Sequence, residues 1–506
     1  MKTARIGLCL PSGILLTLSF LGCGVASQPP AASISPTANP LVAQYNITNF
    51  HSGLTAWVEF GPTTSYGRQT SMVTTTKTTI GGQPAGVLVA GMKPQTTYHM
   101  RAHVEWAQGS WVDQDRTFTT GAIPSTYQMP QISVTTPSSG QGLSPAPGIE
   151  LLSMTSATNT KMLSGVATDL QGNVIWYCPG LAFPQKLQPN GHFVINQNYD
   201  LEEVDLACNQ VRAITLAQLN TALNAKGYFY NLLYFSHDFL VLPNGHWIAL
   251  VQVTQNFSDL PGYPGTTGVL GDIVVDIDPN GAVDWLWSAY DHLDVNRHLQ
   301  GLPDWTHSNA LVYTADGNIL LSMRNQSWII KIDYADGVGT GNILWTLGDG
   351  GDFTVLGGDP TQWFYGQHDP GVVTTDGSQT VLNVFDDGNL RVDSDGVQCG
   401  TSSTAPACYS RAAQYLLDES TNLATPSWSF SPGLYSFWGG SIGTLSNGDV
   451  ELALSEPFLN NPTESQIMEV SGTGTAQVVW QMNVSGENVY RGVRSPSLYP
   501  GVTWQQ

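Results

Sequence analysis

The alternation of apolar and polar residues repeats as a four-strand unit over the C-terminal two thirds of the chain. The first half of the unit is a strand, a turn containing Asn-Gly or Asp-Gly, and a second strand, at 237–251, 307–323, 368–384 and 439–454. The second half is a strand, a turn and a strand ending in Trp, at 274–287, 329–345, 412–428 and 467–480. Fainter copies lie at 168–178 and 187–197. Tandem four-stranded units are typical of a β-propeller, and we expect six blades within residues 148–506.

Residues 41–121 show a different pattern, with short alternating runs that predict a β-sandwich. The run from Met92 to Ala102, which contains Pro94 and Tyr98, together with the TFTTG ending resembles a fibronectin type III module. A linker at 122–147 joins this sandwich to the predicted propeller. Residues 24–40 are rich in Pro, Ser and Ala and predict a flexible tether. The fold class predicted for the whole chain is all-β.

Composition agrees with this class and narrows the function. Only 11% of the 506 residues are charged, whereas 53 are Gly and 30 are Pro, a mixture that favours strands and turns over helices. The formal net charge of −21 argues against nucleic acid as a partner. It leaves an anionic small substrate open, because local residues set the electrostatic potential in a pocket.

The first 23 residues predict a secretory signal. Lys2 and Arg5 precede a short apolar stretch at 14–21 that is too short for a lasting membrane span. The following Cys23 lies in a sequence that resembles a bacterial lipobox, so we expect either a lipid anchor on Cys23 or ordinary cleavage nearby. The protein is therefore expected to be exported, to the periplasm or the cell surface, and to meet the membrane through a lipid anchor only.

Four cysteines remain after the signal, and export makes disulfides plausible for them. Cys399 and Cys408 lie in one loop and are the first expected pair; Cys178 and Cys208 follow by elimination. The chain has no CxxC or other zinc-type spacing.

Three histidines occupy the same phase of the repeat. His237, His307 and His368 each open the first half-unit, where the fourth copy has Gly439-Gly440. The first strand of a propeller blade lines the central channel, so these imidazoles are expected to converge at one mouth of that channel.

Two polar side chains are expected beside the histidines. Asn309 lies two residues after His307 and hence on the same face of the strand. The hairpin that turns at Asp316-Gly317 places Arg324 across from Asn309. Arginine, an amide and imidazole N–H groups together suit a tetrahedral oxyanion such as sulfate or phosphate.

Two acidic residues that follow histidines are interpreted as structural and not catalytic. Asp238 and Asp369 alternate to the opposite face of their strands from His237 and His368. They are expected to bind neighbouring backbone.

This constellation, with the order sandwich then propeller, resembles the bacterial arylsulfate sulfotransferase family. The likeness spans most of residues 41–506, and its most specific elements are His307-Ser308-Asn309, Arg324 and His368-Asp369. The resemblance implies sulfuryl transfer from a phenolic sulfate ester to an acceptor phenol, with no nucleotide donor and no cofactor or metal. It places His368 as the nucleophile, a choice that spacing alone does not make, and His237, His307, Asn309 and Arg324 around the sulfate. A homodimer is compatible with the resemblance.

The chemistry follows a ping-pong order. The His368 imidazole attacks sulfur, phenoxide leaves, and His307 or His237 supplies a proton. Two other hypotheses remain: a metal site formed by the three histidines, which the neighbouring Arg324 disfavours, and a non-catalytic binding lipoprotein of the cell surface.

Overall fold

The computed structural model describes residues 30–48, 53–75, 85–107, 109–137, 142–155, 161, 163–180, 182–392, 396, 398–400, 408–457, 464–472 and 474–505. The predicted signal at 1–23, including Cys23, lies outside these residues. Strands dominate the described part of the chain, and almost all pair antiparallel, so the predicted all-β class is confirmed. No helix among the described residues is long and apolar enough to cross a membrane.

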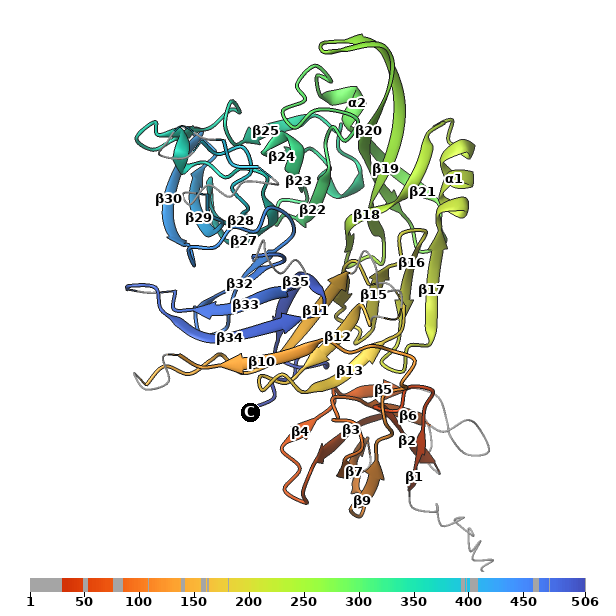
Figure 1. The fold of residues 1–506 in the computed structure, drawn as a ribbon. Coiled ribbons are helices and arrows are strands. Elements are labelled where there is room, and N and C mark those ends of the chain that lie inside the picture. Colours follow the sequence, from red (N-terminus) through yellow and green to blue (C-terminus); the bar gives the residue numbers. More distant parts are fainter. Residues whose placement is uncertain are drawn as a thin grey trace, which may run out of the picture.

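The N-terminal strands form two sheets at the lower end of the molecule (Figure 1). Tyr98 is buried between them, and its hydroxyl accepts a hydrogen bond from the backbone N–H of Lys93 at 3.0 Å. The first sheet contains β1 (Ala31–Pro36), β2 (Ala43–Thr48) and β6 (Ala85–Val89); the second contains β3 (Leu54–Gly61), β4 (Arg68–Gln69), β5 (Val73–Thr75), β7 (Thr97–Trp106), β8 (Gly109–Val112) and β9 (Arg116–Thr119).

Six sheets of four or five strands follow in the described part of the chain. The first three are β11 (Ile149–Thr155), β12 (Gly165–Thr168), β13 (Val174–Cys178) with β35 (Asn488–Ser495); β14 (Gln185–Leu187), β15 (Phe193–Asn196), β16 (Asp200–Val204), β17 (Gln210–Thr215); and β18 (Asn231–Val241), β19 (Trp247–Leu260), β20 (Tyr263–Ile277), β21 (Val283–Ser288). The last three are β22 (Ser308–Tyr313), β23 (Ile319–Met323), β24 (Trp328–Ile332), β25 (Ile343–Leu347); β26 (Thr354–Val355), β27 (His368–Asp376), β28 (Gln379–Asp386), β29 (Arg411–Asp418), β30 (Leu423–Phe430); and β10 (Gln131–Thr135), β31 (Ser441–Thr444), β32 (Val450–Leu454), β33 (Glu464–Val470), β34 (Val478–Ser485).

The first strands of neighbouring sheets contact one another in chain order. β18 contacts β22, β22 contacts β27, β27 contacts β31, and β31 contacts β35. β35 comes from the C-terminal end of the chain but pairs with β11 of the first of these sheets, from Ile149 with Ser495 to Thr155 with Asn488. The two ends of this part of the chain are therefore joined in one sheet.

Among the residues that the structure describes, two α-helices interrupt the strands: α1 (Leu216–Ala225) and α2 (Ala289–His292). α1 begins where Thr215 and Gln218 form a capping box, in which each side chain bonds the other's backbone N–H. Its Leu219 and Leu223, four residues apart, are buried against the β18–β21 sheet.

Two segments predicted to be irregular contain strands. Within the predicted tether at 24–40, Ala31–Pro36 forms β1 and pairs with β2. Within the predicted linker at 122–147, Gln131–Thr135 forms β10 and pairs with the edge of β34. The physical reason in both cases is an unpaired sheet edge, whose backbone groups take up any nearby extended segment.

The recurring Trp residues that end the second half-units are largely core residues, as expected. Trp287 and Trp480 are 1% exposed and Trp345 is 6% exposed. Each lies in an apolar cluster that joins strands of neighbouring sheets.

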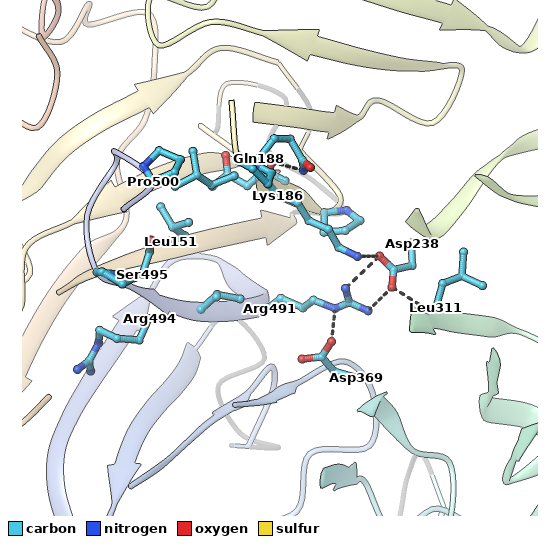
Figure 2. Close-up of a pocket in the computed structure, with 16 residues that line it drawn as sticks. Leu151, Lys186, Gln188, Asp238, Leu311, Asp369, Arg491, Arg494, Ser495 and Pro500 are labelled. Atoms are coloured by element: carbon cyan, nitrogen blue, oxygen red, sulfur yellow. Dashed lines mark hydrogen bonds and ion pairs between the residues drawn. The ribbon is translucent and has the colours of Figure 1, made fainter. Parts of the chain in front are cut away.

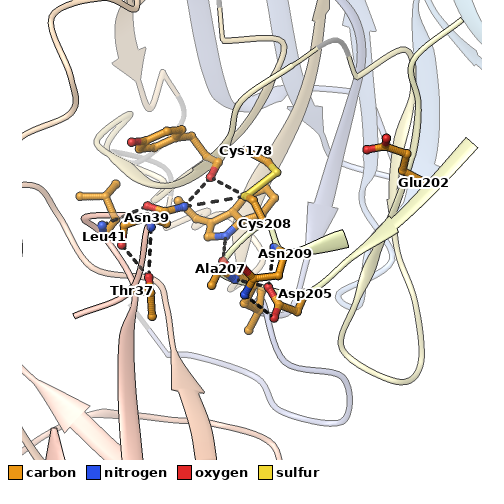
Figure 3. Close-up of a disulfide and its surroundings, with 12 residues drawn as sticks. Thr37, Asn39, Leu41, Cys178, Glu202, Asp205, Ala207, Cys208 and Asn209 are labelled. Atoms are coloured by element: carbon orange, nitrogen blue, oxygen red, sulfur yellow. Dashed lines mark hydrogen bonds between the residues drawn. A yellow bond between two sulfur atoms is a disulfide. The ribbon is translucent and has the colours of Figure 1, made fainter. Parts of the chain in front are cut away.

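Both expected disulfides are formed, Cys399–Cys408 and Cys178–Cys208. Beside the second (Figure 3), the Asn39 amide donates to the backbone oxygen of Tyr177 at 2.7 Å. This contact ties the N-terminal sheets to the sheet containing β13.

Candidate active site

The structure brings the three predicted histidines together. His237 lies in β18, His307 directly precedes β22, and His368 opens β27. The ring centres of His237 and His307 are 4.6 Å apart. The ring of Tyr490, on β35, lies 5.9 Å from that of His237 and 6.0 Å from that of His368. β18, β27, β35 and the residue before β22 therefore supply one aromatic and imidazole cluster.

His368 has defined partners at both ring nitrogens. Its Nδ1 lies 2.6 Å from Oδ2 of Asp387, and both side chains are almost completely buried. The backbone N–H of Gly439 donates to its Nε2 at 3.2 Å. Because Nε2 accepts this hydrogen bond, it is the unprotonated nitrogen and the ring proton is at Nδ1, toward Asp387. An electrophile that binds Nε2 must take the place of the Gly439 N–H.

Burial sets the electrostatics of this pair. It lowers the pKa of His368 well below its usual value, and the positive charge of Arg324 lowers it further. Burial also raises the pKa of Asp387 well above that of an ordinary carboxyl, against the opposing effect of Arg324. The His368 ring is therefore neutral at neutral pH, and because Nε2 accepts from the Gly439 N–H, the one ring proton lies at Nδ1.

The other two histidines are also held through Nδ1. Nδ1 of His307 lies 2.5 Å from Oδ2 of Asp304, and Nδ1 of His237 lies 2.7 Å from the hydroxyl of Ser236. Burial alone would raise the pKa of Asp304, but the hydrogen bond to His307 lowers it overall, so Asp304 is ionised. His307 has a positive φ of 45°, a left-handed conformation that is costly for this residue type and occurs most often at functional sites.

Arg324 is a buried cation held by neutral groups. Its guanidinium donates to the backbone oxygen of Phe437 at 2.9 Å and to the Asn325 side chain at 2.9 Å, while its Nε has no partner in the described structure. No carboxylate among the described residues forms an ion pair with it, and it is only 8% exposed. A buried guanidinium that has a spare N–H and makes no direct ion pair favours an anion beside it.

The predicted register between Asn309 and Arg324 is wrong. The pairing shifts between Ser308 and Ala310, so Ser308 pairs with Met323 and Arg324 begins a 3-10 turn beyond the strand. Arg324 N–H instead donates to the backbone oxygen of His307. A bulge at Asn309 is the physical reason, since an extra residue on one strand moves its neighbours along the partner strand.

Asn309 consequently has a different environment from the predicted one. Its amide nitrogen donates to the backbone oxygen of Gln367 at 2.7 Å, which fixes the residue before His368. Its side-chain oxygen is buried without a hydrogen-bond partner in the described structure.

Asp238 and Asp369 bind neighbouring backbone, as interpreted from the sequence. Asp238 accepts from the N–H of Leu311 at 2.9 Å, and Asp369 accepts from the N–H of Ile442 at 3.3 Å. Both also line a cavity of about 560 Å³, together with Lys186 and Arg491 (Figure 2). None of the three histidines is among the residues that line it.

Four residues of the site were missed by sequence reasoning: Asp304, Asp387, Gly439 and Tyr490. A signal existed for Asp387, because its hairpin pairs His368 with Phe385, two residues before it. Gly439 was visible as the glycine that replaces a histidine in the fourth repeat. A Cβ at Gly439 would lie 2.2 Å from the Ser455 hydroxyl, so only glycine brings this backbone to His368. Asp304 and Tyr490 come from outside the recognised half-units.

The site has no metal-type ligand set in the described residues. No group of three or more His, Cys, Asp or Glu side chains there is arranged to hold a metal ion.

Comparison with known proteins gives one extended match. The family model described as Arylsulfotransferase (ASST) matches residues 144–491, which include all three histidines and both Asp–His pairs. No curated protein matches. Among solved structures, a Bacteroides caccae protein of unknown function is 11% identical, with 69% of this chain and 98% of that chain covered and a TM-score of 0.40. A mutant of Synechocystis apocarotenoid oxygenase is 9% identical, with 93% and 97% covered and a TM-score of 0.28.

Proposed function

The chain belongs to the arylsulfotransferase family, and on that premise we propose that it transfers a sulfuryl group from a phenolic sulfate ester to an acceptor phenol through a sulfohistidine at His368, without a nucleotide donor. The observation that carries the proposal is the hydrogen bonding of His368. Asp387 holds the proton at Nδ1, so that Nε2 is the unprotonated nitrogen, and it becomes the nucleophile when the Gly439 N–H passes from it to a sulfuryl oxygen. The charge of Arg324 acts on the same ring.

In the first half-reaction, Nε2 of His368 forms a bond to sulfur while the bond between sulfur and the phenolic oxygen breaks. The electron pair of that bond leaves with the phenoxide. The imidazole gains positive charge in this step, and the carboxylate of Asp387 at Nδ1 stabilises it. In the second half-reaction, the oxygen of an acceptor phenol attacks sulfur while its proton passes to His307, which gave up a proton in the first step. The N–S bond breaks, its electron pair returns to Nε2, and His368 and His307 regain their starting forms.

Two donors support the sulfuryl oxygens in this scheme. Arg324 offers its unpaired Nε–H, and the Gly439 N–H lies at the nitrogen to which sulfur would bind. Arg324 is buried, so its attraction for developing negative charge is only weakly screened by solvent. Asn309 acts indirectly, by holding the Gln367 carbonyl next to His368.

His307 is the better proton donor to the leaving phenoxide. The ionised Asp304 lies at Nδ1 of His307, which leaves Nε2 as the nitrogen that would pass a proton to the substrate. His237 lacks such a carboxylate, because its Nδ1 faces the Ser236 hydroxyl, and burial lowers its pKa well below the usual value. His237 is therefore assigned to holding the substrate.

An aromatic wall next to the imidazoles suits the aryl group. The rings of Phe183 and Tyr490 lie 4.2 Å apart, and Phe183 also makes an edge contact with His237 at 5.4 Å. Flat aromatic groups favour stacked or edge contacts with such a wall.

The fold details belong to the same proposal. The six sheets are interpreted as the blades of a propeller, because their first strands contact one another in order and β35 closes the first sheet. The two N-terminal sheets are interpreted as a fibronectin type III-like module. Export to the periplasm or cell surface, with a lipid on Cys23, remains part of the proposal; the two disulfides are consistent with export.

The test is incubation of the purified chain with a chromogenic aryl sulfate, with and without added phenol. The proposal predicts slow release of chromophore alone and fast release with phenol, accompanied by formation of the sulfated acceptor. Chromophore release that is equally fast without phenol would indicate hydrolysis instead. No release with any aryl sulfate would refute the proposed activity and favour a binding function.

A further inference from the structure

Arg491 is a buried arginine to which the mechanism above assigns no role. It follows Tyr490 on β35 and is 4% exposed. Its Nη2 donates to the backbone oxygen of Asn309 at 2.8 Å, and its Nη1 lies 3.2 Å from Oδ1 of Asp238. Its Nε lies 3.3 Å from Oδ1 of Asp369 (Figure 2). A single guanidinium thus joins β18, β22 and β27 to β35.

These three strands are the ones that carry the candidate catalytic groups. Asp238 directly follows His237, and Asp369 directly follows His368. Asn309 lies two residues after His307 and itself holds the residue before His368. Any change in the contacts of Arg491 therefore moves the backbone next to an imidazole.

Arg491 itself is not placed to touch substrate. It lines the 560 Å³ cavity, whose described lining includes none of the histidines. Consecutive residues of a strand point to opposite sides, so Arg491 faces away from the cluster that contains Tyr490.

We infer that Arg491 is a positioning residue, whose guanidinium fixes the three strands that present His237, His307 and His368 and so aligns the nucleophile with the sulfuryl group. The inference rests on the proposed function for its kinetic readout. Misplacement of reacting groups by about 1 Å can lower a rate about a hundredfold. Without Arg491, the buried carboxylates of Asp238 and Asp369 lose their common cation, and Lys186 pairs only with Asp238.

Lysine at this position would restore the charge but not the geometry. A lysine ammonium is a single point of positive charge, whereas the planar guanidinium reaches two carboxylates and a carbonyl in fixed directions. Arg491→Lys is therefore expected to be intermediate between the wild type and Arg491→Ala.

The experiment uses the 560 Å³ cavity as the entry route for a small cation. Arg491→Ala leaves a guanidinium-sized space open to it, so guanidinium ion added at millimolar concentration can enter and replace the missing group. The matched control is Arg494→Ala. Arg494 lies on the same strand and borders the same cavity, but it binds Glu150, Glu451 and Glu469, none of which lies on a histidine-bearing strand.

The inference predicts that Arg491→Ala lowers the rate constant of the first phenol release about a hundredfold, with the donor KM changed less than about threefold. Added guanidinium should raise the rate constant of Arg491→Ala at least about tenfold, and an equal concentration of sodium chloride should not. Arg494→Ala should lower the melting temperature but keep the rate constant. A folded Arg491→Ala protein with wild-type kinetics, or equal kinetic losses in both variants, would overturn the inference.

A second readout does not depend on sulfuryl transfer. The Nδ1 proton between His368 and Asp387 should give a far-downfield proton NMR signal, assigned by its loss in His368→Ala. In Arg491→Ala this signal should shift or broaden, and guanidinium should restore it. If the wild type shows no phenol release, the proposed function fails and this signal alone decides the role of Arg491. An unchanged signal in Arg491→Ala, or in Arg491→Lys if the alanine variant does not fold, would overturn that role.

Discussion

Replacing Asp387 by asparagine tests how His368 is activated. The carboxylate lies 2.6 Å from Nδ1, and both groups are buried, so little solvent screening intervenes. If the ring gains about half a positive charge as the N–S bond forms, a carboxylate centred about 4 Å away stabilises that charge by about 2 kcal/mol at an effective dielectric constant of 20. Exchange of a charge-assisted for a neutral hydrogen bond adds about 1 kcal/mol.

The total of about 3 kcal/mol corresponds to a loss of about a hundredfold in rate. The loss is larger if the asparagine NH₂ group donates to Nδ1, because the ring proton then moves to Nε2 and blocks the lone pair. The assay is stopped-flow release of chromophore from an aryl sulfate, in which the first turnover reports His368 attack directly.

The matched control is Asp386→Asn. Asp386 is the neighbouring, equally buried acid, but it pairs with Arg391 and Arg411 instead of a histidine. This control should lose stability and keep the first-turnover rate. A folded Asp387→Asn protein with wild-type first-turnover kinetics would refute the role given to Asp387.

Three further predictions follow from the described residues and the N-terminal sequence. Arg324→Ala should lower the rate of sulfuryl transfer about 10²- to 10³-fold, because a buried guanidinium at the sulfuryl oxygens is lost. Arg324→Lys should recover part of this rate. Steady-state kinetics of Arg324→Ala that match the wild type would show that Arg324 does not face the substrate. Burial lowers the pKa of His237 and His368 in the folded protein below the usual 6.5. Below that pH the unfolded chain therefore binds more protons than the folded protein. The free energy of unfolding should decline by up to about 1.4 kcal/mol per pH unit for each histidine as the pH falls. Urea unfolding of His237→Gln should show a shallower decline than the wild type, and an identical decline would contradict these lowered values. Cys23→Ser should release the mature protein from membranes in a fractionation experiment, and unchanged fractionation would remove the lipid anchor from the account.

Repetition in the sequence made the fold class and the imidazole cluster predictable. A histidine at one phase of three successive units must appear at equivalent places in three successive sheets, and the structure brings His237, His307 and His368 together accordingly. The disulfide between Cys399 and Cys408 was predictable from their nearness in the chain. The strand β10 was not, because it pairs with β34, which is distant in the sequence. The strand β1 pairs with the nearby β2, but its composition of Pro, Ser and Ala does not indicate a strand.

The supporting residues were harder to predict because they act across long separations. The bulge that displaces Asn309 from Arg324 is not visible in the alternation of apolar and polar residues. Arg491 contacts Asp238, which is far away in sequence, and this contact exists only because β35 returns to the first sheet. Asp387 could have been placed near His368 in the same way as Arg324 was placed near Asn309, by pairing residues across the hairpin.

The most direct test of the central claim is mass spectrometry of the protein after incubation with an aryl sulfate donor and no acceptor. The account predicts one equivalent of phenol released per site and one SO₃ group on the peptide that contains Gln367-His368-Asp369, labile to acid and removed by added phenol. An SO₃ group on His237 or His307 would contradict the assignment of the nucleophile. Fast transfer to phenol with no adduct on any histidine would contradict the covalent mechanism itself.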